Sequence, residues 1–317
     1  MLCLLTDWRP LRLPFRRLYG GFVLKNSAMS LERRYKNVGW LFVWPAAILI
    51  FLLNFYPMLQ AFLLSLQSGI SNNLHFSGLH NYIRLFKDKN FIQAVKNVFI
   101  YFVIQVPIML FLALILAVIL NDKKLPFRGF FRTLVFLPSV TSLVASALIF
   151  KSFFAIDGLM NTILMELSFI SEPKNWLASP GWARAIIIMT MTWRWTGYNT
   201  IFFLAGLQNI DPQIYEAALI DGSSPIQTFF KITLPLLRPV ILLTAIMSTN
   251  GTLQLFDEVR NITGGGPGNS TLTISQYIYN LSFAGNPQFG YAAAVSYTIL
   301  IMVAILTFIQ MQIGDKK

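Results

Sequence analysis

The chain alternates long apolar runs with short polar segments, and this pattern predicts a bundle of membrane-spanning helices. A helix needs about 20 mainly apolar residues to cross the hydrocarbon core of a bilayer. Six runs meet or approach this length, although the fifth is short and contains polar residues. They are approximately Trp40–Leu66, Val95–Leu120, Thr133–Phe154, Ala185–Leu207, Val240–Phe256 and Gly290–Met311. We therefore expect an all-α integral membrane protein with six transmembrane helices.

The composition favours one membrane domain over the two soluble domains that the length alone would suggest. Hydrophobic residues make up 55% of the 317 residues, charged residues make up 12%, and the mean hydropathy is +0.59. Average soluble domains carry about 25% charged residues. Cys3 is the one cysteine of the chain, which excludes an intrachain disulfide and a cysteine-rich metal site.

The distribution of basic residues predicts the orientation of the spans. A net charge of +12 would suggest nucleic-acid binding in a soluble protein. Here sixteen lysines and arginines lie in the segments of one side, eight lie in those of the other, and Arg194 falls inside a span. Because cytoplasmic loops of membrane proteins are enriched in Lys and Arg, we expect both termini and the segment after the fourth span in the cytoplasm.

Three regions follow from the spans and the charges. Residues 1–39 form a basic cytoplasmic N-terminal segment, residues 40–312 form the six-helix membrane domain, and residues 313–317 form a cytoplasmic tail. The N-terminal segment lacks the long apolar core and the small-residue cleavage site of a secretory signal. Two interpretations of Leu11–Leu24 stay open, a basic amphipathic segment on the membrane surface and a disordered leader. Met29 is a possible alternative start.

A polar segment between the fourth and fifth spans carries the signals of two short helices. Asp211-Pro212 and Ser224-Pro225 are helix starts, because the first residue of each pair can accept a bond from an amide of the first turn and proline fits the first helical position. Gly222 can adopt the left-handed conformation that ends the first helix. Leu234-Pro235 and the Arg-Pro pair after it are expected to break the second helix. Residues 211–238 thus predict a compact helix–turn–helix.

The same segment resembles the "EAA" signature, E-A-A-x-x-D-G-x(9)-I-x-L-P, of the permease subunits of binding-protein-dependent ABC importers. The residues in register are Glu216, Ala217, Ala218, Asp221, Gly222, Ile232, Leu234 and Pro235. The resemblance implies the type I ABC importer permease fold, with this segment as a coupling helix in a cleft of a cytoplasmic ATPase. It assigns the ATPase contact to Glu216, Ala217, Ala218, Asp221 and Gly222, with Glu216 as the ionic contact. Without the signature, an interfacial hairpin with no partner would fit the segment as well.

Three further segments resemble sugar-class permeases of the maltose type: Phe131–Pro138, Phe203–Ile210 and Thr263–Pro267. The resemblance extends from about Trp40 to Ile309. It implies half of a pathway for a sugar or oligosaccharide in a bacterial inner membrane, working by alternating access. The implied partners are a second homologous permease, two ATPase subunits that carry ATP and Mg, and an extracytoplasmic solute-binding protein. The family favours a heterodimer of permeases over a homodimer. The chain itself is then a transport subunit, not an enzyme, and carries no cofactor.

Polar residues inside the fourth and fifth spans are the candidates for the substrate pathway. Polar side chains at membrane depth are costly and therefore usually functional. Aromatic rings stack on the apolar faces of sugars, and amide or hydroxyl groups bond sugar hydroxyls. The alternative is hydrogen bonding between helices of the bundle. The candidates are Trp193, Arg194, Tyr198, Asn199, Asn250, Thr252 and Gln254.

Arg194 raises the possibility of an acidic cargo. An arginine at a span centre costs about 2.5–3.5 kcal/mol on insertion scales, so it should face water, a carboxylate or an anionic ligand. An anionic ligand would be a uronic-acid oligosaccharide or a sugar phosphate. The alternatives are an internal ion pair and a position nearer the membrane surface.

The glycine-rich stretch Gly264, Gly265, Gly266 and Pro267 lacks the Gly-Lys-Ser/Thr ending of a phosphate-binding loop, so we expect any ATPase to be a separate subunit. In the family this outer loop approaches the solute-binding protein, and a flexible connection is the alternative. His75 and His80 have no cysteine or carboxylate array at ligand spacing, so no metal site is predicted.

Two other functions are compatible with a membrane bundle. A stand-alone secondary transporter or channel is disfavoured by the scarcity of membrane carboxylates and by the lack of an inverted repeat. A membrane-embedded transferase would need paired acidic residues for a metal and a diphosphate. Asp257-Glu258 is the one adjacent acidic pair, and it has no companion motif.

Overall fold

The computed structural model describes residues 38–71 and 73–315. The chain divides into two units, Met1–Gln60 and Ala61–Lys317. In the first unit the described residues are helical and belong to a helix that runs from Val38 to Ser65. This helix contains a π-helical turn, η1 (Phe51–Phe55), followed by α2 (Tyr56–Ser65). The basic segment predicted for residues 1–39 lies outside the described residues, apart from its last two.

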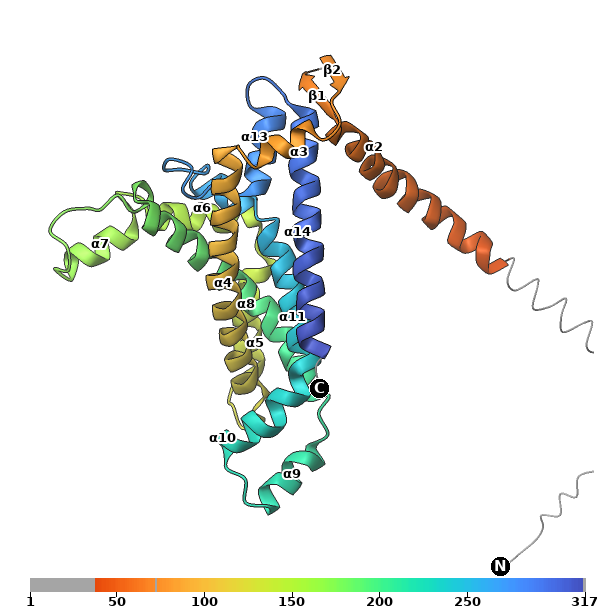
Figure 1. Ribbon diagram of the computed structural model, residues 1–317. Helices are drawn as coiled ribbons and strands as arrows, with labels where there is room; N and C mark the ends of the chain where they lie inside the picture. Colours follow the sequence, from red (N-terminus) through yellow and green to blue (C-terminus); the bar gives the residue numbers. More distant parts are fainter. Residues whose placement is uncertain (1–37, 72, 316–317) are drawn as a thin grey trace, which may run out of the picture. The chain divides into compact units, whose positions relative to one another are not determined.

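The second unit begins with a short β-hairpin and then turns into the longest helix. Strands β1 (Gln67–Ile70) and β2 (Asn73–Phe76) pair antiparallel, with Gln67 opposite Phe76. The short helix α3 (His80–Leu85) leads to α4 (Lys89–Asn121), which begins at the same end of the unit as the hairpin (Figure 1). Pro107 lies within α4 without ending it.

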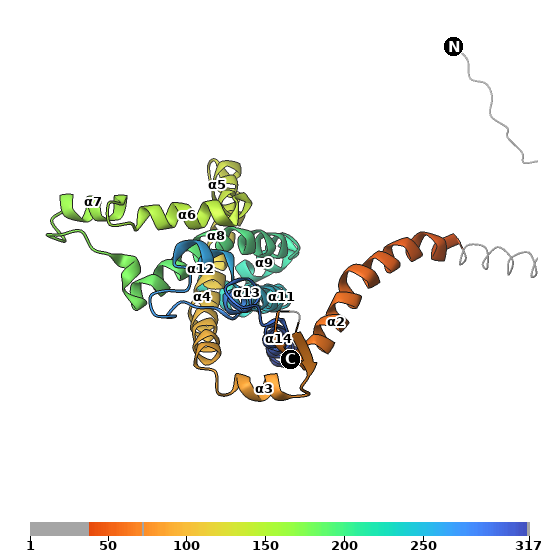
Figure 2. The same ribbon diagram turned by 90° about the horizontal axis from the view of Figure 1, so that it is seen from above.

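A bundle of long helices forms the centre of the second unit. Helix α4 packs against α8 (Pro180–Gln208) and α11 (Leu234–Leu253), and α11 packs against α14 (Phe289–Asp315). Seen along the bundle, these helices lie close together and α6 and α7 extend to one side (Figure 2). Ala113 and Ala117 of α4 are fully buried against α8. Small residues at such crossings let membrane helices approach closely.

The third predicted span is broken into two helices. α5 (Arg128–Val140) and α6 (Leu143–Phe153) differ in direction by 96°. Thr141 and Ser142, between them, have extended backbones. The Thr141 hydroxyl donates to the Pro138 carbonyl at 2.6 Å, which gives the backbone a local alternative to helical hydrogen bonds. After α6 the chain continues through α7 (Leu159–Glu166) and the 3₁₀ turn η2 (Trp176–Ala178).

Four described helices are long and apolar enough to cross a membrane, and the bent α5–α6 pair makes a fifth candidate. The four are Val38–Ser65, Lys89–Asn121, Pro225–Leu253 and Phe289–Gly314. The remaining predicted span corresponds to α8, which is 29 residues long. Its Arg194, Asn199 and threonines make it more polar than the others. All six predicted spans therefore correspond to a helix or a bent pair of helices.

The segment after α8 folds into two short helices, as the sequence predicts, but the second continues into the next span. α9 (Pro212–Ile220) is followed by α10 (Pro225–Thr228), the π turn η3 (Phe229–Thr233) and α11. The expectation that Leu234-Pro235 and Arg238-Pro239 would break this helix is wrong, because the helix continues from Pro225 to Leu253 with Pro239 inside α11. In the π turn the regular hydrogen-bond pattern is already shifted by one residue, and Pro235 lies two residues after the end of this turn, in the first turn of α11.

The C-terminal part completes the bundle and closes the end opposite α9 and α10. α12 (Asp257–Ile262) packs against α6 and α8, and α13 (Ile274–Phe283) packs against α14. Figure 1 shows α3, α13 and the hairpin at one end of the bundle and α9 and α10 at the other. The Arg238 guanidinium donates to the Ile313 carbonyl at 3.0 Å and ties the end of α14 to α11.

Asp88 anchors the beginning of α4 to α13 and α14. Its carboxylate accepts bonds from the backbone amides of Asn90 and Phe91 and from the hydroxyls of Tyr277 and Tyr291, the last at 2.6 Å. Partial burial raises the pKa of Asp88, but these hydrogen bonds outweigh burial, and the net pKa is lowered from its ordinary value of 3.8. Hydrogen bonds to the ionised form have this effect.

We expect Asp88→Asn to lower the thermal unfolding midpoint of the detergent-solubilised protein at neutral pH. Because asparagine still caps the helix, this substitution removes the charge alone. We expect it to lower the free energy of unfolding by about 1 kcal/mol. Because the folded-state pKa is lowered, the charge stabilises the fold above the unfolded-state pKa and loses this effect as the pH falls through the folded-state value. The difference between the proteins should shrink on acidification. Asp122→Asn, at an exposed carboxylate, is the control, and a pH-independent difference would contradict the assignment.

Candidate functional site

A cavity of about 370 Å³ lies among α4, α8, α11 and the start of α12. α4 contributes Gln105 and Met109, and the middle of α8 contributes Trp195, Tyr198 and Asn199. The remaining wall comes from the end of α11 and the chain that leads into α12. The other residues that line the cavity are Leu143 of α6, Met191 of α8, and Met247, Ser248, Asn250, Gly251, Thr252, Gln254, Leu255, Phe256, Asp257 and Glu258. The wall thus combines aromatic, amide and carboxylate groups.

Five of the seven predicted pathway residues meet at this cavity: Tyr198, Asn199, Asn250, Thr252 and Gln254. Two of them also bond within the bundle, as the alternative interpretation expected. The Asn199 amide donates to Met109 Sδ of α4 at 3.5 Å, as well as to the Trp195 carbonyl of its own helix at 3.0 Å. The Thr252 hydroxyl of α11 donates to Gln105 Oε1 of α4 at 3.2 Å. Asn250 and Gln254 are exposed and hydrogen bond to each other. Their amides are the ones most accessible to a ligand.

The aromatic wall of the cavity is formed by Trp195 and Tyr198, whose ring centroids lie 5.7 Å apart. Trp193, which the sequence singled out, lies outside the lining residues, with its ring 5.5 Å from that of Phe150. Side chains two residues apart on a helix point in nearly opposite directions, whereas those three apart share a face. The spacing of Trp195 from Tyr198 was the signal that could have identified it.

Arg194 also lies outside the cavity lining. It is buried, with 8% of its surface exposed, and one guanidinium nitrogen donates to the carbonyls of Thr141 at 3.0 Å and Ser139 at 3.4 Å. These carbonyls lie at the break between α5 and α6. Arg194 also interacts electrostatically with Asp257 and Glu258. The predicted cation is therefore turned toward the protein interior.

The segment from α9 to α10, here called the coupling segment (residues 211–228), has the caps that the sequence predicts. The Asp211 carboxylate accepts from the Gln213 amide at 2.9 Å. Ser224 and Gln227 form a reciprocal capping box, and Gly222 adopts a positive φ of 73°. The Ser223 amide then donates back to the Ala218 carbonyl at 2.9 Å. These local bonds fix the turn between the two helices.

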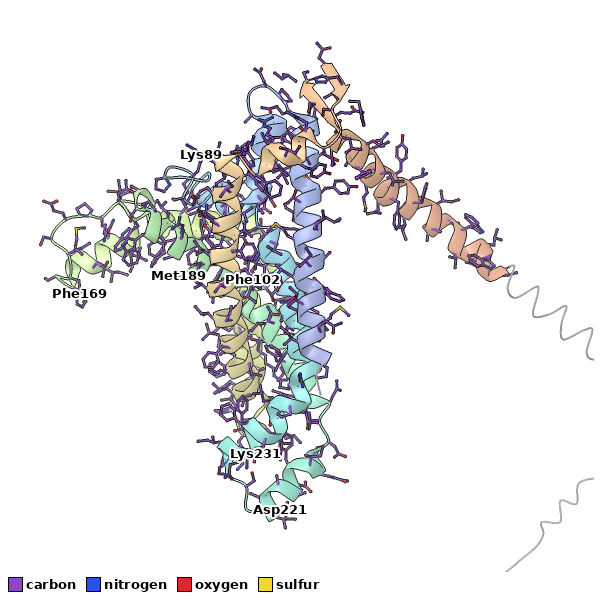
Figure 3. All side chains as sticks on the ribbon, in the orientation of Figure 1. Lys89, Phe102, Phe169, Met189, Asp221 and Lys231 are labelled. Atoms are coloured by element: carbon purple, nitrogen blue, oxygen red, sulfur yellow. The ribbon has the colours of Figure 1, made fainter. Side chains whose placement is uncertain are left out.

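The surface of the coupling segment is both charged and apolar. Of the five residues predicted to contact an ATPase, Glu216, Ala217, Asp221 and Gly222 are exposed and Ala218 is 6% exposed. Asp221 lies at the tip of the bundle (Figure 3). The apolar side chains are those that sequence reasoning missed: Leu219 is 76% exposed, Ile220 86% and Ile226 71%. Contiguous exposed apolar residues on a polar surface segment are typical of an interaction site.

The glycine-rich loop is held firmly at the opposite end of the bundle. The Thr271 hydroxyl donates to the Gly266 carbonyl at 2.7 Å, and the Thr271 amide donates to the Gly265 carbonyl at 3.2 Å. Arg184 of α8 donates to the Ser270 carbonyl at 2.8 Å, and Asn97 of α4 donates to the Leu272 carbonyl at 2.9 Å. Gly264, Gly265, Gly266 and Pro267 therefore form a structured loop.

Within residues 38–71 and 73–315, no cluster of His, Cys, Asp and Glu could hold a metal ion.

These features define a multi-pass membrane transport subunit with a polar cavity and a protruding interaction segment. The chain belongs to the family of binding-protein-dependent transport system inner membrane components, which matches residues 86–315. It is thus a sugar ABC transporter permease, with the type I fold and no enzymatic activity of its own. As a member of a binding-protein-dependent family, it has a solute-binding protein among its partners.

Several known proteins are similar over most of the chain. The lactose transport system permease protein LacF of Rhizobium radiobacter is 55% identical over 90% of this chain and 96% of its own length. The arabinooligosaccharides transport system permease protein AraP of Bacillus subtilis is 32% identical over 88% of this chain and 89% of its own. A crystal structure of a bacterial ABC transporter involved in the import of the acidic polysaccharide alginate has a chain with a TM-score of 0.80. That chain is 22% identical and aligns over 92% of this chain and 100% of its own length, so it shows the shared fold.

Proposed function

We propose that this chain forms half of the translocation pathway of an ATP-driven importer for a sugar or oligosaccharide, in a bacterial inner membrane. The observation that carries the proposal is the cavity. Trp195 and Tyr198 offer faces for a sugar ring, and Asn250 and Gln254 offer amides for its hydroxyls. Relatives named for lactose and arabinooligosaccharides support this class of cargo.

The other half of the pathway is proposed to come from a second, homologous permease, in a heterodimer. Asn250 and Gln254 are exposed although they lie near the end of an apolar spanning helix. Exposed amides at membrane depth require water or polar partners. A central, water-filled space between two permeases would satisfy this requirement and would enlarge the cavity beyond what one chain encloses.

The coupling segment is proposed to lie in the cytoplasm and to dock in a cleft of one of two separate ATPase subunits, which bind ATP and Mg. Its exposed charge and its exposed Leu219 and Ile220 support this role. The structured loop with Gly264 and Pro267 lies at the opposite end and is proposed to face the solute-binding protein. ATP-driven closure would then draw the coupling segments together and open the cavity outward.

An acidic oligosaccharide is the second candidate for the cargo. The cation of Arg194 behind the cavity wall supports it, and the fold is shared with an importer of the acidic polysaccharide alginate. The similarity of fold alone does not identify the substrate. The charge of the groups that line the cavity therefore has to decide between the two classes.

We expect Asn250→Leu to lower lactose uptake about tenfold at saturating solute-binding protein. The variant loses an accessible amide, and the expected effect corresponds to the free energy of one hydrogen bond to the substrate. The measurement uses the complete transporter in proteoliposomes, with its ATPase and solute-binding protein. Asn286→Leu, at an exposed position outside the cavity, is the control. Unchanged uptake in the Asn250 variant, or absence of sugar-stimulated ATP hydrolysis by the wild-type transporter, would contradict the proposed function.

A further inference from the structure

The charged side chains that line the cavity are both carboxylates, Asp257 and Glu258. In the described part of the chain, the lining contains no lysine, arginine or histidine. We propose that these two carboxylates determine specificity: they accept hydrogen bonds from the hydroxyls of an uncharged sugar and keep acidic sugars out. This inference rests on the proposed function and names the substrate class of the same cavity.

The local structure fixes both carboxylates in the cavity wall. α11 ends at Leu253, and α12 begins at Asp257, so the pair occupies the first turn of a new helix. α12 packs against α6 and α8, with Val259 and Ile262 buried in the core that they share. Glu258 is 3% exposed and Asp257 is half-buried. The carboxylates are therefore part of a packed element and not of a mobile loop.

The cation that balances them lies behind the wall. Arg194 interacts with both carboxylates, yet its hydrogen bonds go to backbone carbonyls at the α5–α6 break. Its Nε and Nη1 atoms are buried without a hydrogen-bond partner. Burial raises the pKa of Glu258, although the nearby Arg194 guanidinium acts in the opposite direction. Asp257, the half-buried member of the pair, is therefore the carboxylate that gives the lining its negative charge, and Arg194 is not among the lining residues.

This arrangement suits a neutral sugar and opposes an anionic one. A carboxylate is a hydrogen-bond acceptor with two oxygens, and a sugar supplies hydroxyl donors on neighbouring carbons. The rings of Trp195 and Tyr198 lie in the same wall for the apolar faces of the sugar. The carboxylate of a uronic acid would meet a like charge in the cavity wall and be repelled by it.

A cysteine probe tests the charge of the cavity without requiring transport. In the complete transporter, Cys3→Ser removes the native thiol and Ser248→Cys places one in the cavity lining. We expect cationic trimethylammonium-ethyl methanethiosulfonate to react about tenfold faster than the anionic sulfonatoethyl reagent, relative to an exposed Asn286→Cys control. Adding Asp257→Asn and Glu258→Gln should bring the ratio to that of the control. A ratio that these changes leave unaltered would overturn the proposal.

Uptake of a matched pair of sugars tests the specificity itself. The pair is lactose and the same disaccharide oxidised to a carboxylate at C6 of the galactosyl ring. Asp257→Asn with Glu258→Gln should lower the uptake rate of lactose and narrow the preference for lactose over the acid by about tenfold. Selectivity of the solute-binding protein is common to wild type and variant and cancels in this comparison. A preference that the two substitutions leave unchanged would overturn the proposal.

The two experiments separate the inference from the proposed function. If the wild-type transporter moves neither sugar, the proposed function fails while the thiol reactivities still report on the carboxylates. If lactose is transported but neither measurement responds to Asp257 and Glu258, the transport function stands and the specificity assignment fails. Glu258→Gln alone is measured as well. Because glutamine keeps the shape of the side chain and one acceptor oxygen, this variant tests the loss of the carboxylate without a loss of folding.

Discussion

Replacement of Glu216 by lysine is expected to uncouple ATP hydrolysis from sugar uptake. Glu216 is an exposed carboxylate on α9, next to the exposed apolar side chains of Leu219 and Ile220. In the proposed complex it is the ionic contact to the ATPase. Loss of one partner of a desolvated charge pair in an interface costs about 2–5 kcal/mol, and lysine reverses the charge. Uptake in proteoliposomes should therefore fall by more than about tenfold, while the ATPase retains hydrolysis that no longer depends on sugar.

Two variants control this experiment. Glu216→Gln keeps the size of the side chain without the charge, and its uptake should be intermediate between wild type and Glu216→Lys. Glu166→Lys makes the same charge change at an exposed residue of α7, outside the coupling segment, and should leave uptake unchanged. Stoichiometric assembly together with normal transport in Glu216→Lys would argue against the coupling role.

The features that depend on local chemistry could be predicted from the sequence. The spans follow from runs of apolar residues, which need no knowledge of the tertiary structure. The caps at Asp211 and Ser224 and the positive φ of Gly222 follow from residue types within a few positions. The π turn before Pro235 was missed because a proline only marks a place where regular helix bonding must change, and the neighbouring structure decides how.

The features that depend on contacts between distant segments could not be predicted. Composition alone made Thr133–Phe154 one span, but the chain turns by 96° where Arg194 of α8 binds the carbonyls at the end of α5. This bond joins residues 53 positions apart. Arg194 was expected to face water, a carboxylate or an anionic ligand, whereas its hydrogen bonds go to backbone carbonyls whose position depends on where α5 ends. For the same reason the position of Asp257 and Glu258 in the cavity wall became visible only in the fold.

The crossing of α5 and α8 also depends on Gly197, which no sequence pattern singled out. A β-carbon on Gly197 would collide with the backbone carbonyl oxygen of Val135 in α5. Gly197 lies between Trp195 and Tyr198 of the cavity wall, so this contact brings α5 against the part of α8 that forms the candidate site. Close backbone approach at a glycine is a known device of packed membrane helices.

Gly197→Ala is expected to lower the thermal unfolding midpoint and to reduce sugar uptake together. The colliding atom belongs to the backbone, so α5 has to move away from α8, at an expected cost of about 1–3 kcal/mol. That movement also displaces the carbonyls that bind Arg194. Gly206→Ala on the same helix is the matched control: its β-carbon would meet the side-chain atoms Leu237 Cδ2 at 2.9 Å and Val240 Cγ2 at 3.0 Å, which can rotate. Equal midpoints for the two variants, measured in detergent, would contradict a backbone contact at Gly197. A lower midpoint with unchanged uptake would show that the α5–α8 crossing supports the fold without shaping the cavity.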